Sequence, residues 1–303
     1  MQSDIKKRIG ILRGGVGENY VSSLNEGGGI IAHILENLGD KYKTVDILID
    51  HDGFWHLNGL PVRAAELPYK VDMVWNVAHP EASSVLDSFS IPYIGKSAFS
   101  HTLLNSREML REHIKKIGVG MPRSILIAPY QADMDGPRER YSIKKAKAVH
   151  EKFGAPWIVQ SFAEDKSMGI HVAKTFNELV GAIEDGVNHG KGILVEEFIE
   201  GKPSAVHTIP DFRGEEVYVM IPDNFSISEK EEIGVLARNL HGHLGGECYL
   251  KTDFILSPRR GLVVTNIDFS PDLRANSHLH QACQSVGAKM NNIVEHMLEG
   301  VIN

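Results

Sequence analysis

The chain has 303 residues, of which 42% are hydrophobic and 23% charged, as is usual for a globular protein. Its formal net charge of −7 argues against broad, unspecific binding to nucleic acid, because phosphates require a basic surface. No apolar run reaches the roughly 20 residues that cross a bilayer, and the N-terminus has no long apolar signal core. We therefore expect a cytoplasmic protein with no nucleic-acid or membrane partner. The two cysteines, Cys248 and Cys283, are expected to be buried free thiols.

The first part of the chain alternates strand patterns with a helix pattern. Residues 8–12 predict a short buried strand, followed by the glycine-rich segment 13–28. A helix is then predicted from apolar residues at helical spacing, namely Leu24, Ile31, Leu35 and Leu38. Further strands are predicted near residues 44–49 and 71–77. This order favours parallel strands with crossover helices, in a lobe that ends near residues 91–95.

The rest of the chain also mixes helix and strand patterns around an expected loop at residues 128–141. Apolar positions that recur on one side predict a helix at residues 97–117. A basic helix is expected at residues 142–153, and a final helix at about residues 278–299. Apolar runs predict strands at residues 123–127, 156–162, 192–203, 249–256 and 261–269. The last two strands are separated by so few residues that we expect a hairpin.

Four motifs follow one another along almost the whole chain. They are RGGVGENYVSS at 13–23, IPYIGKSAFSHTLLNSREMLREHIKKIGVGMP at 91–122, ILVEEFIEGKP at 193–203, and KTDFIL with VVTNIDFSPDLRANS within 251–277. Their order and spacing resemble the D-alanine–D-alanine ligase family of the ATP-grasp superfamily. The first is similar to the opening Gly-Gly-x-Ser-x-Glu-x-x-Val-Ser of that family. The last is similar to its Arg-x-Asp-Phe followed by Glu-x-Asn-x-x-Pro-Gly-Met-x-x-x-Ser.

The resemblance implies an α/β protein with an ATP-grasp fold and a parallel-sheet lobe before it. The implied lobes are an N-terminal substrate lobe (1–96), a central lobe (97–192) and a C-terminal lobe with metal and substrate residues (193–303). ATP would lie between the sheets of the last two lobes. ATP would phosphorylate the carboxylate of one D-alanine, and the amine of a second would attack the acyl phosphate. The implied cofactors are ATP and Mg²⁺, the substrates are small amino acids, and homodimers are common in the family.

The metal site implied by the resemblance lies on the C-terminal hairpin. Asp253 matches the first ligand of the family, while Asn266 replaces a bridging glutamate and Asp268 replaces an asparagine. Residues 266 and 268 share one face of a strand, since side chains alternate there. Two carboxylates and an amide suit one Mg²⁺ better than two. The alternative is that Asp253 and Asp268 are solvated strand ends.

The nucleotide residues implied by the resemblance lie on the strand near residue 196. Glu196 matches the position that binds the adenine amino group, and the rest of the hinge matches Glu197, Phe198 and Ile199. Pro203 replaces a glutamate that binds ribose in the family, and its side chain has no hydrogen-bonding group. The alternative is an ordinary edge strand with exposed glutamates.

The phosphate-binding residues differ more from the family pattern. One family lysine is replaced by the uncharged Gln160, and another by Arg107, which keeps the charge. The loop with Lys166 and Ser167 stands where the family has Gly-Ser-Ser-x-Gly, so Lys166 is a candidate for the missing charge. A polar surface turn is the alternative.

The implied catalytic and substrate residues are Glu18, Lys251 and Ser277. Glu18 matches the glutamate that contacts the first amino group, and Lys251 replaces an arginine that stabilises the oxyanion. Ser277 matches the serine that holds the second carboxylate. The alternatives are a helix-dipole carboxylate for Glu18 and a helix N-cap for Ser277. Asp272 replaces a glycine and would repel a carboxylate if it pointed inward.

Three functions remain open from the sequence. The first is an ATP-dependent carboxylate–amine ligase like D-alanine–D-alanine ligase, which the ordered motifs favour and which would place the protein in peptidoglycan biosynthesis. The second is a catalytically impaired relative that binds nucleotide or a partner, as Gln160 and Asn266 would suggest. The third is a ligase with a different amino-acid substrate, as Lys251 and Asp272 would suggest.

Overall fold

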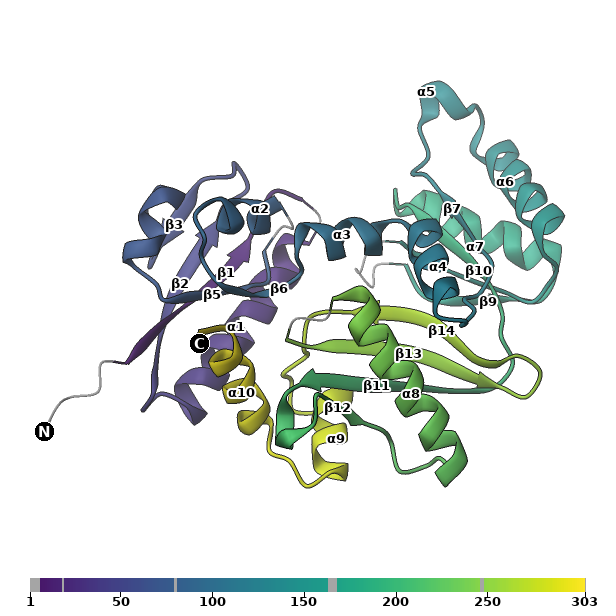
Figure 1. Ribbon diagram of the computed structural model, residues 1–303. Helices are drawn as coiled ribbons and strands as arrows, with labels where there is room; N and C mark the ends of the chain where they lie inside the picture. The colour runs from purple at the N-terminus through teal and green to yellow at the C-terminus, as the bar shows by residue number, and fades with distance from the viewer. Residues whose placement is uncertain (1–5, 18, 79–80, 163–167, 246–247, 303) are drawn as a thin grey trace, which may run out of the picture. The chain divides into compact units, whose positions relative to one another are not determined.

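The structure is a computed structural model (Figure 1). It describes residues 6–17, 19–78, 81–162, 168–245 and 248–302. The chain packs as two compact units. Unit 1 contains residues 1–119, 203–254 and 264–303, and unit 2 contains residues 120–202 and 255–263. The lobe boundaries expected after residues 96 and 192 stay a prediction.

A six-stranded sheet forms the N-terminal part of unit 1, with the order β4-β3-β2-β1-β5-β6. Its strands are β1 (Lys7–Gly14), β2 (Tyr42–Ile49), β3 (Trp55–Leu57), β4 (Leu60–Pro61), β5 (Met73–Asn76) and β6 (Tyr93–Gly95). β1 is parallel to β2 and β5, and β5 is parallel to β6. β3 and β4 continue the sheet in antiparallel pairing. The predicted parallel sheet is therefore confirmed.

Helices cover both faces of this sheet. α1 (Tyr20–Asn37) and α10 (Met290–Ile302) share a hydrophobic core with β1, β5 and β6. The short helix η1 (Ala64–Tyr69) and α2 (Glu81–Ser88) pack against the opposite face. α1 is confirmed where the sequence predicted a helix, but its buried line runs through Gly27, Ile30, Ile34 and Leu38. Leu35, which the apolar spacing had included, is 57% exposed.

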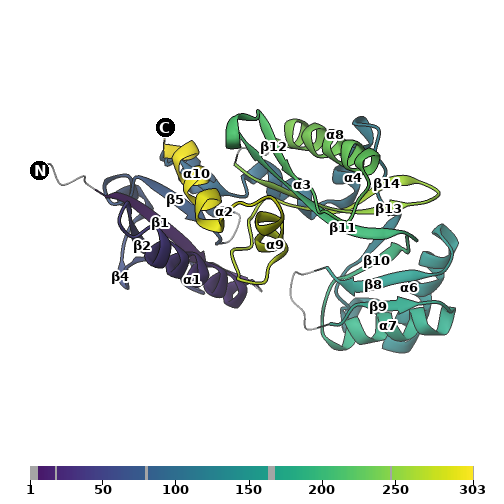
Figure 2. The ribbon, with the colours of Figure 1, turned by 90° about the horizontal axis from the view of Figure 1, so that it is seen from below.

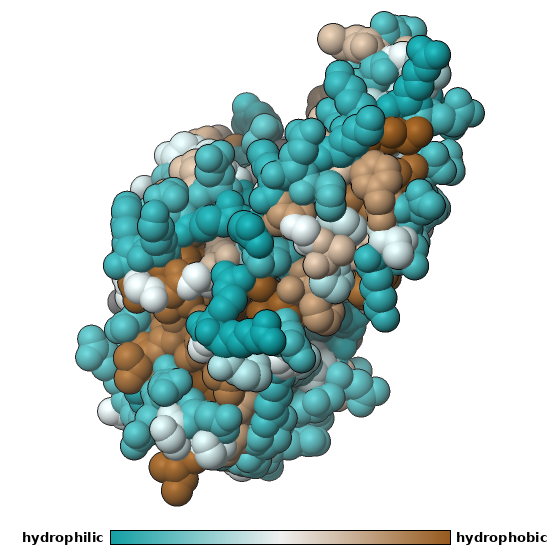
Figure 3. Space-filling view, turned by 90° about the vertical axis from the view of Figure 1, so that its right-hand side faces the viewer, coloured by the Kyte–Doolittle hydropathy of each residue, from teal (hydrophilic) through white to brown (hydrophobic). Residues whose placement is uncertain are grey.

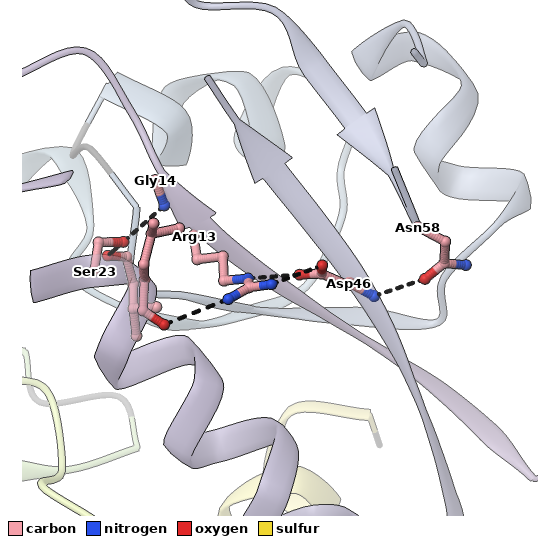
Figure 4. A network of polar contacts seen from close by, with 7 residues as sticks. Arg13, Gly14, Ser23, Asp46 and Asn58 are labelled. Atoms are coloured by element: carbon pink, nitrogen blue, oxygen red, sulfur yellow. Dashed lines mark hydrogen bonds and ion pairs between the residues drawn. The ribbon is translucent and has the colours of Figure 1, made fainter. Parts of the chain in front are cut away.

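Polar contacts at the end of β1 fix the start of α1 (Figure 4). Arg13 donates two hydrogen bonds to the carboxylate of Asp46 on β2, at 2.7 and 2.8 Å, and a longer one to the carbonyl of Leu24. The amide of Gly14 donates to Ser23 Oγ at 2.9 Å. The first turns of α1 are thus tied to the carboxyl end of the central parallel strand.

A four-stranded sheet, in the order β12-β11-β13-β14, forms the C-terminal part of the chain. Its strands are β11 (Lys202–Pro210), β12 (Val217–Met220), β13 (Leu250–Ser257) and β14 (Gly261–Asp268). The short helix η2 (Phe212–Gly214) joins β11 to β12. β13 and β14 are neighbours, which confirms the predicted hairpin.

The two faces of this sheet are covered differently, because successive side chains of a strand point to opposite faces. Thr208 of β11 binds His241 of α8 (Ile227–Leu244), with 2.9 Å between Oγ1 and Nδ1. His207, the preceding residue, binds His278 of α9 (His278–Ser285) instead. α8 and α9 therefore lie on opposite faces (Figures 1 and 2).

Unit 2 contains an antiparallel sheet in the order β7-β10-β8-β9. Its strands are β7 (Ser124–Ile127), β8 (Trp157–Ser161), β9 (His171–Ala173) and β10 (Ile193–Glu197). α6 (Arg138–Lys152) and α7 (Phe176–Asn188) pack on one hydrophobic core with it. The loop expected at residues 128–141 was partly wrong, because it contains the short helix α5 (Ala132–Asp135) and the first turn of α6.

Two predicted long helices are each broken in two. The expected helix 97–117 consists of α3 (Ala98–Asn105) and α4 (Arg107–Lys116). Ser106 separates them with extended backbone angles (φ −116°, ψ 95°), and its side chain caps α4 by accepting from the amide of Met109. The expected helix 278–299 consists of α9 and α10, with Gly287 between them at a φ of 62°.

Hydrophilic side chains dominate the face drawn in Figure 3, with apolar side chains in smaller patches between them. Within the part of the chain that the structure describes, none of the helices is both long and apolar enough to cross a bilayer.

Candidate active site

Polar side chains gather on the α9-facing side of the C-terminal sheet, all within unit 1. Lys251 and Asp253 lie two residues apart on β13 and so share one face. The Lys251 ammonium lies 2.8 Å from Asp253 Oδ1 and 3.0 Å from Oδ2. Asn266 of β14 donates to the same carboxylate at 3.4 Å. The hairpin thus brings these three predicted site residues into one cluster.

Asp268 is the second carboxylate on this side of β14. Its Oδ1 accepts from the amide of Ser270 at 3.0 Å and lies 3.6 Å from the Lys96 ammonium. Lys96 was not predicted from the sequence. It follows Gly95 at the carboxyl end of parallel strand β6, the edge where ligands bind in such sheets. That position was the signal that could have identified it.

The predicted metal residues supply two carboxylates and one amide oxygen. No group of three or more His, Cys, Asp or Glu side chains that could hold a metal exists among the residues described. A metal at Asp253 and Asp268 would therefore need the amide oxygen of Asn266 or oxygens of a substrate. Such a set of hard oxygen ligands fits one Mg²⁺, which often keeps waters and phosphate oxygens as further ligands.

Asp272 lies in the loop after β14 and is neutralised locally. Arg274 holds its carboxylate with two hydrogen bonds, at 2.8 and 2.5 Å. These bonds, with a smaller contribution from Lys251, lower the pKa of Asp272. The repulsion of a substrate carboxylate that the sequence suggested is thereby reduced.

Ser277 caps α9. Its side chain accepts from the amide of His280 at 3.1 Å, and the residue is 7% exposed. The N-cap that was one of the two readings of Ser277 is present. Its contact with a substrate carboxylate stays a prediction.

A buried chain of hydrogen bonds lies beside this cluster, and it too was not predicted from the sequence. The Tyr249 hydroxyl lies 2.7 Å from His207 Nδ1, and His207 Nε2 lies 2.7 Å from His278 Nδ1. Burial lowers the pKa of His207 well below its usual value and also lowers the pKa of His278. Burial also raises the pKa of Tyr249 well above its usual value. All three groups are therefore neutral near pH 7.

The predicted adenine residues lie on β10 and just after it, and Gln160 lies on the neighbouring strand β8, all in unit 2. Gln160 and Glu196 are on the same face of the sheet, with 3.4 Å between Nε2 and Oε2. Glu196 and Ile199 are 8% and 7% exposed, whereas Phe198 is 41% exposed. Glu196 and Gln160, for which the sequence predicted contacts with adenine and with phosphate, are therefore neighbours on one face of this sheet.

Glu197 is held by two arginines that the sequence did not indicate. Arg123 donates to its carboxylate at 3.1 and 2.9 Å, and Arg260 donates at 3.2 Å. The hydrogen bonds from Arg123 lower the pKa of Glu197. The side chain of Glu197 is therefore committed to this ion-pair cluster, and its backbone amide donates to the carbonyl of Arg123 at 2.9 Å.

Comparison with known proteins gives a consistent result. Residues 122–211 match the family model for the D-ala D-ala ligase C-terminus. A D-alanine–D-alanine ligase of Azobacteroides pseudotrichonymphae is 21% identical, over 97% of this chain and 100% of that protein. The D-alanyl-alanine synthetase A of Vibrio cholerae has a TM-score of 0.75 at 16% identity, over 98% of both chains. The ATP complex of a Bacillus anthracis D-alanine–D-alanine ligase has a TM-score of 0.66 at 17% identity, over 98% and 97% of the chains.

The resemblance to D-alanine–D-alanine ligases is confirmed. The fold is that of the ATP-grasp enzymes, as the sequence predicted. The correspondence of Asp253, Ser277, Gln160 and Asn266 with individual positions of these ligases stays a prediction.

The remaining predicted residues have different outcomes. Arg107 begins α4, and its Nη1 donates to the carbonyl of Thr265 on β14 at 2.9 Å, so this cation lies beside the strand of Asn266. Glu18, Lys166 and Ser167 lie outside the residues that the structure describes. Their roles in the D-alanine–D-alanine ligase pattern stay predictions.

Proposed function

We propose that the protein is an ATP-dependent carboxylate–amine ligase that joins two small amino acids, as D-alanine–D-alanine ligases do. The observation that carries the proposal is the cluster of Lys251, Asp253 and Asn266 on one face of the hairpin. Asp268 and its partner Lys96 extend this cluster. A similarity that runs from end to end of the chain supports the same reading.

The proposed reaction has two steps. A carboxylate oxygen of the first D-alanine attacks the γ-phosphorus of ATP, and ADP leaves. The amine of the second D-alanine then attacks the carbonyl carbon of the acyl phosphate and loses a proton. Phosphate departs with one oxygen of the original carboxylate, and the peptide bond remains.

In this proposal the residues of unit 1 act on the amino acids and on the transferred phosphate. Asp253, Asn266 and Asp268 would hold one Mg²⁺, which supplies positive charge to the phosphate oxygens when bound. Lys251 would stabilise the oxyanion that forms when the amine attacks. Glu18 would hold the first amino group, and Ser277 would hold the second carboxylate.

The adenine-binding residues are proposed separately, for unit 2. Glu196 and the backbone through Phe198 and Ile199 would bind adenine, because an apolar slot with backbone donors and acceptors suits a purine. Gln160 would contact phosphate through hydrogen bonds without a charge. Arg107, Lys166 and Ser167 would supply the remaining phosphate contacts.

Two alternatives rest on specific observations. The uncharged Gln160, bound to Glu196, favours an impaired relative that binds nucleotide or a partner without turnover. The Lys251–Asp253 pair and the Asp272–Arg274 pair favour a ligase with a different amino-acid substrate. Each alternative leads to a different result in one experiment.

The experiment measures phosphate release by the full chain with ATP and Mg²⁺, first with D-alanine and then with a panel of small D- and L-amino acids. Release that depends on D-alanine supports the ligase. Release with another amino acid alone supports the changed substrate. Nucleotide binding in calorimetry without release for any amino acid would reject the proposal in favour of the impaired relative.

A further inference from the structure

Two histidine side chains meet on the surface of unit 1, away from the candidate active site. His113 lies in the last turn of α4 and His243 in the last turn of α8, and the two residues are 130 positions apart in the chain. The helices α4 and α8 are in contact. α8 covers one face of the C-terminal sheet, and the cluster of Lys251 and Asp253 lies on the other. The histidine pair therefore has no part in the reaction proposed above.

The distance between the two rings is long for a hydrogen bond. Nδ1 of His113 lies 3.3 Å from Nε2 of His243, whereas an N–H group usually lies about 2.7–3.2 Å from an oxygen acceptor. The ring planes are tilted by 50° and their centroids are 5.3 Å apart. The rings thus approach through their nitrogen atoms and not through stacked faces.

The same distance fits two neighbouring ligands of one metal ion. Imidazole nitrogens bind Zn²⁺ at about 2.0–2.1 Å. With 3.3 Å between the nitrogens of His113 and His243, their angle at such an ion is about 104–111°. This range includes the tetrahedral angle, which is the geometry that four-coordinate Zn²⁺ adopts. The two helices therefore hold the nitrogens at the spacing of a tetrahedral site.

The surroundings of the pair act on a cation in opposite directions. The carbonyl groups at the ends of both helices favour positive charge. Phe99 packs edge-on against His113, with ring centroids 6.0 Å apart, and limits the movement of that ring. Burial, with smaller effects of Lys116 and His243, lowers the pKa of His113, and a neutral imidazole is the form that binds a metal. Lys116 carries a positive charge close to His113 and so opposes the binding of a cation.

We propose that His113 and His243 bind one Zn²⁺, or another divalent ion that prefers nitrogen ligands, and that this ion joins α4 to α8. Two protein nitrogens leave two positions of the tetrahedron for water or for a small ligand from solution. Mg²⁺ is a poor competitor, because it prefers oxygen ligands in an octahedron. An ion that binds the folded chain and links segments so far apart in sequence stabilises the fold. This site goes beyond the proposed ligase activity and does not depend on it.

The test titrates the full chain with Zn²⁺ alone, without nucleotide or Mg²⁺. Calorimetry should show an ion that an excess of Mg²⁺ does not displace, and the melting temperature should rise with the Zn²⁺ concentration. The ¹⁵N chemical shifts of the His113 and His243 rings should change together during the titration. His113→Gln and His243→Gln should each weaken binding by at least about tenfold, because loss of a group that only orients a metal ligand already costs about 10–100-fold.

Two further variants are matched controls. His189 lies at the end of α7 and binds Asp185 of its own helix, so His189→Gln removes an exposed ring that is not paired with an imidazole and should leave the Zn²⁺ affinity unchanged. Lys116→Gln removes the opposing charge and should tighten binding. Without Zn²⁺, His113→Gln and His243→Gln should keep the urea midpoint of the unmodified chain, because His113 is half-buried and His243 is exposed.

The outcomes separate this site from the proposed function. Unchanged Zn²⁺ affinity in both His113→Gln and His243→Gln would overturn the proposal. Loss of the ion in Asp253→Asn, with both histidine variants unaffected, would assign the ion to the hairpin and overturn it as well. Because binding is measured without turnover, absence of phosphate release would reject the ligase and leave the metal site intact.

Discussion

Replacement of Asp253 by asparagine distinguishes a catalytic role of this carboxylate from a structural role. The change keeps the shape of the side chain and removes its charge. Asp253 is paired with Lys251 at 2.8 Å, and the two side chains are 28% and 27% exposed. A partly exposed pair of this kind contributes at most about 1 kcal/mol to stability. We therefore expect Asp253→Asn to lower the melting temperature by only about 2–4 °C.

The effect on activity should be far larger. One of the two carboxylates proposed to hold Mg²⁺ is lost, and the Lys251 ammonium loses the anion that positions it. Removal of a single preorganised electrostatic group typically costs about 10²–10³-fold in kcat. Phosphate release with D-alanine, measured over a range of Mg²⁺ concentrations, should fall by at least about 100-fold, on that same scale.

Asn266→Asp is the matched variant, because it adds a carboxylate to the same cluster. It should lower the Mg²⁺ concentration needed for half-maximal activity. Retention of more than a third of the activity in Asp253→Asn would refute the assigned role. A loss of several kcal/mol of stability, together with the activity, would show instead that the residue supports the fold.

Three further predictions concern the fold around the site. Burial raises the pKa of Cys283 to about 11, so iodoacetamide at pH 8 should label Cys283 only after unfolding and should label Cys248 sooner. Equal labelling rates of the two cysteines in the folded protein would contradict this. The pKa of His207 is lowered in the folded protein, so below pH 6.5 the unfolded chain binds a proton that the folded protein does not bind. The contribution of His207 to the free energy of unfolding is therefore present above pH 6.5 and is lost as the pH falls. His207→Gln should make the fall in unfolding free energy between about pH 6 and 5 shallower by up to about 1.4 kcal/mol per pH unit, and parallel denaturation curves would exclude this. Gly14→Ala places a Cβ 2.2 Å from the carbonyl of Ile49 at a φ of +84°, so it should destabilise the protein by about 2 kcal/mol or more in urea unfolding, and an unchanged midpoint would contradict the strain.

Elements marked by local patterns were predictable from the sequence. The strand at residues 8–12 and the hairpin that begins near residue 249 were found because apolar runs bounded by turn residues identify strands. The breaks at Ser106 and Gly287 were missed, because apolar spacing continues across both of them. A serine that caps the following helix and a glycine with positive φ end a helix without disturbing the periodicity.

The site was predictable only where the resemblance supplied its residues. Lys251, Asp253 and Asn266 were proposed in this way, and the structure brings them together. Lys96 was missed because its contact with Asp268 joins segments far apart in the chain. The contact of His207 with His278 likewise depends on how β11 meets α9, which no local spacing encodes.

The central claim is that ATP activates a carboxylate by phosphorylation before the amine attacks. The most direct test uses D-alanine labelled with ¹⁸O in its carboxylate, together with ATP, Mg²⁺ and the full chain. We expect one ¹⁸O in each phosphate released, with one dipeptide formed per phosphate. Phosphate without label, or its release in the absence of dipeptide, would contradict the account.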